Sequence, residues 1–190
     1  MKTKALWVGL CLLLLTACGP MIGGMMVAGT GVKSFEVVSG DLSDLQPGQQ
    51  VAVLGPFDKT DQAFYICRGE EAASFTSAFN LSKLFGAELA INERFPEELP
   101  SINQFRGQSP AQVQTALGLN KTPEILMSGT ILSRDMVAAP AQGVIMTVSY
   151  RLEFLDLSNG ETVTLEIEVK ELFQDAVPTT VEELAGRLGE

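Results

Sequence analysis

The sequence predicts a single α/β domain, in which a mixed, largely antiparallel sheet of about five or six strands is flanked by about three or four helices. Two runs of alternating apolar residues, at 144–154 and 163–169, are joined through Asn159-Gly160 and predict a β-hairpin. The continuous apolar run at 51–54 predicts a strand covered on both faces. Apolar residues at helical spacing from Glu70 to Phe85 predict a helix that packs on this sheet.

The first residues have the organisation of a bacterial signal peptide. Lys2 and Lys4 form a positive n-region, and an almost unbroken apolar run follows over residues 5–15. A transmembrane helix needs about 20 such residues, so this run is short for one. It ends in Leu15-Thr16-Ala17-Cys18, the arrangement of a lipobox, in which the cysteine becomes the new N-terminus and carries acyl chains. The alternative is an ordinary cleavable signal with a chance cysteine.

These features divide the chain into three parts. We expect residues 1–17 to be the lipoprotein signal peptide, 18–32 to be the lipidated cysteine with a flexible, glycine-rich tether, and 33–190 to be a periplasmic α/β domain. Gly19, not an aspartate, follows the cysteine, which in a Gram-negative cell favours the outer membrane. We therefore expect a lipid-anchored protein on the periplasmic face of that membrane, with the inner membrane and the cell surface as the less favoured locations.

The first half of the domain contains two predicted strands before the helix. Residues 34–39 alternate, with Phe35 and Val37 apolar, and 51–54 form the central strand. We expect 57–69 to be a polar loop. After the helix the sequence predicts a strand at 87–91, a short helix within 96–105, and a helix that begins at a Ser109-Pro110-Ala111-Gln112 cap and ends at Gly118.

The last third contains the clearest strand patterns. We expect a strand at 125–132, a loop at 135–143, and then the hairpin. Its two strands share one apolar face, which helices should cover. Thr180-Val181-Glu182-Glu183 has the pattern of a capping box and predicts the start of a last helix.

The composition excludes several classes of function. The chain has no histidine, which removes the commonest general base and the commonest metal ligand. Its formal net charge is −10 and its lysines and arginines do not cluster, so we expect no binding to nucleic acid. Beyond Cys18 the only cysteine is Cys67, which we expect to be packed among apolar neighbours. We therefore expect no metal site and no cofactor.

Paired carboxylates also have ordinary explanations. The three acidic pairs lie at or near predicted helix starts, where the helix dipole favours negative charge: Glu70-Glu71, Glu97-Glu98 and Glu182-Glu183. Neighbouring residues on a helix do not face each other, so none of these pairs is a catalytic dyad. No nucleophile elbow or calcium loop occurs in the sequence. We therefore expect that the protein is not an enzyme.

An ordered set of short motifs resembles the curli-secretion lipoprotein family. The motifs are Val51-Ala52-Val53-Leu54-Gly55-Pro56-Phe57, Asn92-Glu93-Arg94, Leu117-Gly118, Gly129-Thr130-Ile131, Leu152-Glu153-Phe154-Leu155-Asp156 and Gly160-Glu161. The same set is similar to the amino-terminal domain of TolB and to the lipoprotein activators of penicillin-binding proteins. The resemblance implies a periplasmic, membrane-tethered binding domain in envelope assembly. It carries over no catalytic residue.

Two functions follow as hypotheses. The first is a non-enzymatic accessory module that binds an envelope protein, for which Tyr65, Phe95 and Phe105 are candidate interaction residues because they fall in or beside predicted loops. The alternative is a subunit of an oligomeric outer-membrane secretion channel. Only the hairpin strands within 144–169 reach the length of about 9–11 residues that a membrane strand needs. The sequence leaves the oligomeric state open.

Overall fold

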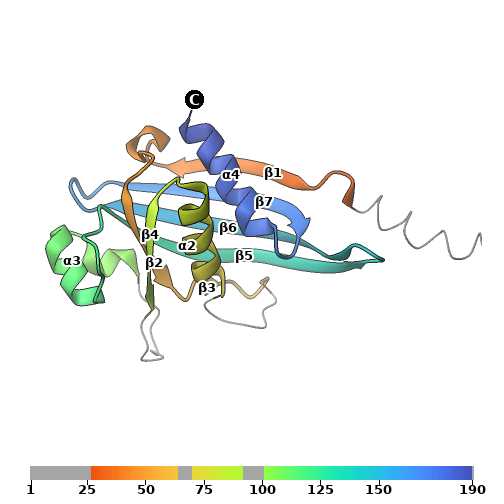
Figure 1. Ribbon diagram of the computed structural model, residues 1–190, viewed down its shortest axis with the longest axis horizontal. Helices are drawn as coiled ribbons and strands as arrows, with labels where there is room; N and C mark the ends of the chain where they lie inside the picture. Colours follow the sequence, from red (N-terminus) through yellow and green to blue (C-terminus); the bar gives the residue numbers. More distant parts are fainter. Residues whose placement is uncertain (1–26, 64–69, 92–100, 190) are drawn as a thin grey trace, which may run out of the picture.

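The computed structural model describes residues 27–63, 70–91 and 101–189 (Figure 1). These residues form one α/β domain around a seven-stranded mixed sheet, which confirms the predicted fold class. Along the sheet the strands follow the order β1-β7-β6-β5-β2-β4, and β3 pairs with β5 beside β2. The bounds are β1 Gly31–Ser39, β2 Gln50–Gly55, β3 Asp58–Lys59, β4 Gly86–Ile91, β5 Ile125–Ala139, β6 Gly143–Asp156 and β7 Thr162–Leu172.

The sheet is antiparallel on one side and parallel on the other. β1, β7, β6 and β5 pair antiparallel in succession, while β2 lies parallel to both β5 and β4. All four residues of the 51–54 run are almost fully buried, as a strand with parallel neighbours and covered faces requires. The apolar faces of the predicted hairpin, β6 and β7, are buried together, which confirms that both strands contribute to one core.

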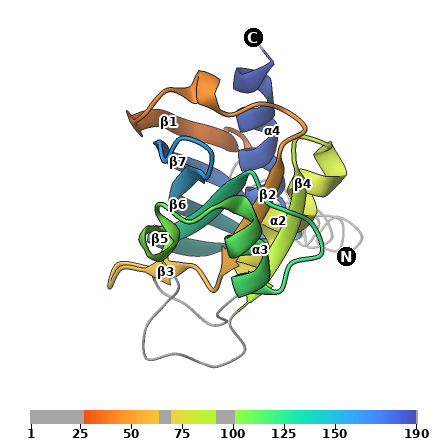
Figure 2. The ribbon, with the colours of Figure 1, turned by 90° about the vertical axis from the view of Figure 1, so that its left-hand side faces the viewer.

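Within the described residues, three α-helices pack on this sheet. α2 (Glu70–Ser82) and α4 (Ala176–Leu188) lie side by side on one face, over the largest core cluster (Figure 1). α3 (Pro110–Leu117) belongs to a second, smaller cluster under the other face, near the ends of β2, β4 and β6 (Figure 2). Two short 3₁₀ turns complete the described chain, η1 (Leu42–Asp44) and η2 (Ile102–Phe105).

The cap predicted for α3 is present in full. The Ser109 hydroxyl accepts from the Gln112 amide, and the Gln112 side chain accepts from the Ser109 amide. Gly118 ends the helix in the left-handed conformation at φ 65°. α2 ends earlier than expected, at Ser82, because Lys83 takes a positive φ and the chain turns into β4 at Gly86.

Gly129 on β5 leaves space for the aromatic ring of Phe57, which lies in the segment after β2. A Cβ atom at this position would lie 2.3 Å from the ring of Phe57, so a larger residue would displace that ring. Phe57 in turn packs on Phe75 of α2 at 5.5 Å between ring centroids. The glycine of the Gly129-Thr130-Ile131 motif therefore has a packing role in this chain.

Besides the end of α2, four predicted boundaries were wrong. The strand from Ile125 continues to Ala139 through most of the expected loop at 135–143, and β1 begins at Gly31, inside the segment expected to be the tether. The expected loop at 57–69 contains the short strand β3 and an isolated bridge from Ala63 to Arg134. The last helix begins at Ala176, four residues before the predicted cap.

The error at the last helix has a physical reason. Thr180 is completely buried inside α4, and its hydroxyl donates to the carbonyl of Ala176 one turn earlier. The same hydroxyl chemistry that caps a helix start can bond back to the preceding turn within a helix. Val181 and Leu184 face the core, and Leu188 is partly buried against it, as predicted.

Candidate functional site

A β-bulge in β5 determines which residues face the helices. The register between β5 and β6 shifts between Ile131 and Ser133, so the side-chain alternation changes phase there. Before the bulge Met127 and Ile131 face the large core. After it, Arg134 pairs with Val148 and turns toward the same face. The bulge thus brings a guanidinium under the start of α2.

Arg134 forms a buried ion pair with Glu71 of α2. Their side chains are only 6% and 8% exposed, and the guanidinium Nη2 donates to the carboxylate Oε1. Burial acts to lower the pKa of Arg134, but the hydrogen bond and charge of Glu71 outweigh it, so the pKa of Arg134 is raised. Burial raises the pKa of the neighbouring Tyr150 hydroxyl, and the Glu71 carboxylate raises it further. Arg134 therefore stays a cation and Tyr150 a neutral phenol near pH 7.

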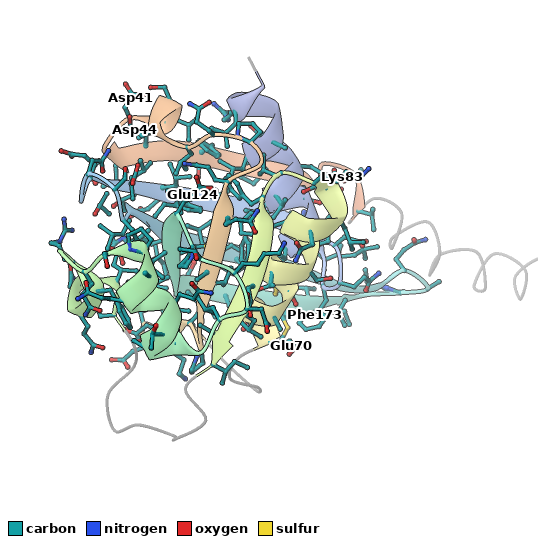
Figure 3. The ribbon with its side chains drawn as sticks, turned by 60° about the vertical axis from the view of Figure 1, so that its left-hand side comes forward. Asp41, Asp44, Glu70, Lys83, Glu124 and Phe173 are labelled. Atoms are coloured by element: carbon teal, nitrogen blue, oxygen red, sulfur yellow. The ribbon has the colours of Figure 1, made fainter. Side chains whose placement is uncertain are left out.

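A small pocket opens beside this cluster between α2, β6 and the start of α4. It has a volume of about 220 Å³, and its lining includes Glu70, Glu71, Tyr150 and Phe173. Figure 3 shows Glu70 and Phe173 close together on this side of the molecule. The volume is below the range of about 300–1,000 Å³ that is usual for small-molecule sites. The pocket therefore does not identify a substrate.

Two larger grooves lie on the surface. One, of about 570 Å³, lies between the start of α3 and the turn from β6 to β7, where Arg106 donates to the Gly160 carbonyl at 2.6 Å and to the Thr162 hydroxyl at 2.9 Å. The other, of about 500 Å³, lies between β1 and α4. Within residues 27–63, 70–91 and 101–189, no three cysteine or acidic side chains are placed to hold a metal ion.

The sheet ends in β1 on one side, and this strand is the more exposed of its two edges. β1 pairs with β7 alone among the described strands, and most of its residues are exposed. Val37 and Val38, near its end, are apolar and exposed, Val38 by 49%. An edge strand presents unpaired backbone groups to which another chain can add a strand. β1 is therefore a candidate interface.

The β5–β6 hairpin provides a second exposed apolar feature. Val137 on β5 is 46% exposed and Val144 on β6 is 41% exposed. The adjoining Phe173, also 41% exposed, donates its amide to the Val144 carbonyl at 2.9 Å. No charged residue occurs between Met136 and Met146. We call these eleven positions, 136–146, the hairpin tip.

The residues singled out from the sequence are placed as follows. Cys18, Cys67, Tyr65 and Phe95 lie outside the described residues. Phe105 is 9% exposed and packs in the second core cluster with Ile102 and Val113, which leaves little of its ring for a partner. Sequence reasoning did not identify Val38 or the hairpin tip. The absence of charge over 136–146 is the available signal for the tip, but the sequence predicts a loop for 135–143 and a hairpin strand from Val144.

None of the helices in the described ranges is long and apolar enough to span a membrane.

Comparisons with known proteins give a similarity in fold. No protein family model matches the sequence, and no curated protein does. Two solved structures of the PelC dodecamer from Paraburkholderia phytofirmans are similar in structure. The first, with one substitution, is 13% identical at a TM-score of 0.45, and the second is 14% identical at 0.44. Each similarity covers 82% of this chain and 94% of the other. These values describe the path of the backbone.

Proposed function

We propose that this chain is a lipid-anchored, non-enzymatic lipoprotein on the periplasmic face of the bacterial outer membrane, where it binds a strand of another chain through β1. The partner is an envelope protein, in the simplest case a second copy of this chain. The observation that carries the proposal is the exposed edge strand β1, which begins at Gly31, at the end of the proposed tether. The lipobox at Cys18 and the ordered motifs of the curli-secretion group support the location.

The geometry of β1 suits addition of a strand. It is nine residues long, and its paired edge is bonded to β7 along most of its length. An extended partner would form main-chain hydrogen bonds along the other edge, and side-chain pockets would give specificity. Natural edge strands are usually protected from such pairing by lysines, prolines or shortness. β1 carries an exposed Lys33 and two register shifts against β7, at Val32/Ser34 and Val37/Ser39, so the exposed apolar pair Val37-Val38 is only partly protected.

The lipid anchor predicts a specific labelling pattern. Cells that are fed radioactive palmitate should incorporate label into the unmodified protein and into Cys67→Ala, and not into Cys18→Ala. The two variants each remove one of the two cysteines that the proposed mature chain contains, so Cys67→Ala is the matched control. Label should separate with the outer-membrane fraction on a density gradient. Label retained in Cys18→Ala, or absent from the unmodified protein, would contradict the anchor.

The edge strand predicts a change in assembly. Val38→Lys should weaken association by roughly tenfold or more, because each pairing would then desolvate an added ammonium group. The measurement is the molar mass of the detergent-solubilised protein by light scattering, with the detergent's share subtracted, over a range of concentrations. Leu81→Lys on α2 is the control, since Leu81 is 81% exposed and far from β1 in the chain. An unchanged mass in Val38→Lys would exclude β1 as a self-association edge, and in-cell crosslinking through position 38 would then test for a different partner.

The alternative is the secretion-channel subunit, and the lengths of β5 and β6 favour it. At 15 and 14 residues these strands exceed the roughly 9–11 residues of a membrane strand. However, the charged residues Arg134 and Asp135 interrupt β5, and only four of its residues, 136–139, continue without charge toward the turn, which is less than half of a span. The mass measurement distinguishes the two functions: a discrete ring of several copies would call for conductance recordings, and a monomer or dimer would exclude a pore formed by this chain alone.

A further inference from the structure

We propose that the hairpin tip is a second membrane contact, which enters the lipid headgroup region beside the acyl anchor and fixes the orientation of the domain. This inference rests on the proposed lipid anchor. The occupant is the lipid surface itself, and the reasons are the chemistry of the tip, its position relative to the tether and the charge of the rest of the domain.

The tip presents apolar side chains on both faces of the sheet. Val144 shares its face with Met146 and Val148, which are buried under the helices, whereas Val137 pairs with Ile145 and lies on the opposite face. Phe173 adjoins Val144 through a main-chain hydrogen bond. A flat protein surface would cover only one of these faces. A lipid headgroup layer surrounds an inserted loop and covers both.

The tether reaches the sheet at the same end as the tip. Gly31 at the start of β1 pairs with Lys170, which pairs with Thr147, which pairs with Asp135. From this row β5 continues to Ala139, which adds about 13 Å toward the tip at roughly 3.3 Å per residue. Figure 1 shows the start of β1 and the β5–β6 turn at the same end of the molecule. Thirteen residues, 18–30, separate the start of the proposed mature chain from β1, and a random-coil chain of that length has an end-to-end distance of about 20 Å. The tip is therefore within reach of the membrane that holds Cys18.

Charge favours the same orientation. The chain carries a formal net charge of −10, so most of its surface is repelled by anionic lipid. Asp41, Asp44 and Glu124 lie at the other end of the sheet, after the end of β1 and before the start of β5 (Figure 3). The hairpin tip has no charge to desolvate. It is also too short to cross a hydrocarbon core of about 30 Å, so it enters the surface and does not span.

Tryptophan reporters can test the contact in the complete, lipidated protein. Trp7 is the only tryptophan of the sequence and lies in the proposed signal peptide, so each variant would contain one reporter after processing. Val144→Trp and Val137→Trp place it on the two faces of the tip. Ser158→Trp is the control, because Ser158 is exposed in the β6–β7 turn at the opposite end. The proteins are reconstituted in vesicles of phosphatidylethanolamine and phosphatidylglycerol, with or without bromine on the acyl chains.

The expected result is a blue-shifted emission and a roughly twofold loss of intensity with brominated lipid for both tip reporters, and no change for Ser158→Trp. Solvent-like emission without quenching at both tip positions would overturn the contact while leaving the anchor in place. A blue shift without quenching would also overturn it, because the tip would then be covered by protein. Failure of the unmodified protein to float with the vesicles would reject the anchor, and the tip contact with it.

Discussion

Replacing Arg134 with methionine is expected to lower the free energy of unfolding by about 3–5 kcal/mol, because it removes the guanidinium that neutralises a buried carboxylate. The Glu71 side chain is 8% exposed and the guanidinium that neutralises it is 6% exposed, so water replaces little of the lost interaction. Urea unfolding followed by circular dichroism measures the loss.

A second variant separates the effect of charge from the effect of packing. In Glu71→Leu/Arg134→Met both charges are replaced by apolar side chains, and most of the stability should return, since a buried ion pair often contributes little net free energy. The exposed pair Arg151–Glu166 on the same sheet is the control, because its side chains are 45% and 33% exposed. Arg151→Met should cost at most about 1 kcal/mol. If the double variant were as unstable as Arg134→Met, the ion pair would not be the source of the loss.

Much of the fold is predictable where one local rule acts without competition. β6 and β7 bury one face each, so their alternation is regular, and Asn159-Gly160 determines the turn between them. The α3 cap is local as well, since Ser109 and Gln112 bond to each other whatever the rest of the chain does. β3 is an exception, because a strand of two residues has no sequence pattern from which it could be predicted.

The course of β5 was not predictable, because the bulge between Ile131 and Ser133 interrupts the alternation. Read without the bulge, Arg134 belongs to the exposed face and residues 135–143 to a loop with Pro140 and Gly143. The pairing with β6 supplies the missing constraint: Met136 lies opposite Met146, and Val137 lies opposite Ile145. A long-range partner, and not local propensity, extends this strand.

The candidate surfaces depend on topology even more. Whether β1 is central or an edge depends on which strands flank it, and its residues alternate in the same way in both cases. Phe105 illustrates the converse problem, since a ring beside a predicted loop is buried once α3 folds over it. The lipidation proposed at Cys18 is different in kind, because a peptidase reads the local sequence and requires no fold.

The aromatic cluster under α2 gives the second large effect. Phe75 is fully buried and contacts three other rings, with centroid distances of 5.5 Å to Phe57, 5.9 Å to Phe79 and 5.3 Å to Tyr150. Phe75→Ala is expected to lower the free energy of unfolding by about 3–5 kcal/mol, from lost transfer energy and the cavity that remains. At this chain length that loss corresponds to a drop of roughly 6–20 °C in the unfolding midpoint.

The control for this prediction is on the same helix. Leu81 is 81% exposed, so Leu81→Ala opens no cavity, and alanine and leucine have similar helix propensities. This substitution should change stability by less than about 0.5 kcal/mol. Scanning calorimetry or thermal circular dichroism of the three proteins measures both changes. Because Phe75 packs on Phe57 and Tyr150, it joins α2 both to the segment after β2 and to β6. A loss below about 1 kcal/mol in Phe75→Ala would mean that the neighbouring rings close the cavity, and that α2 is held on the sheet by its other contacts.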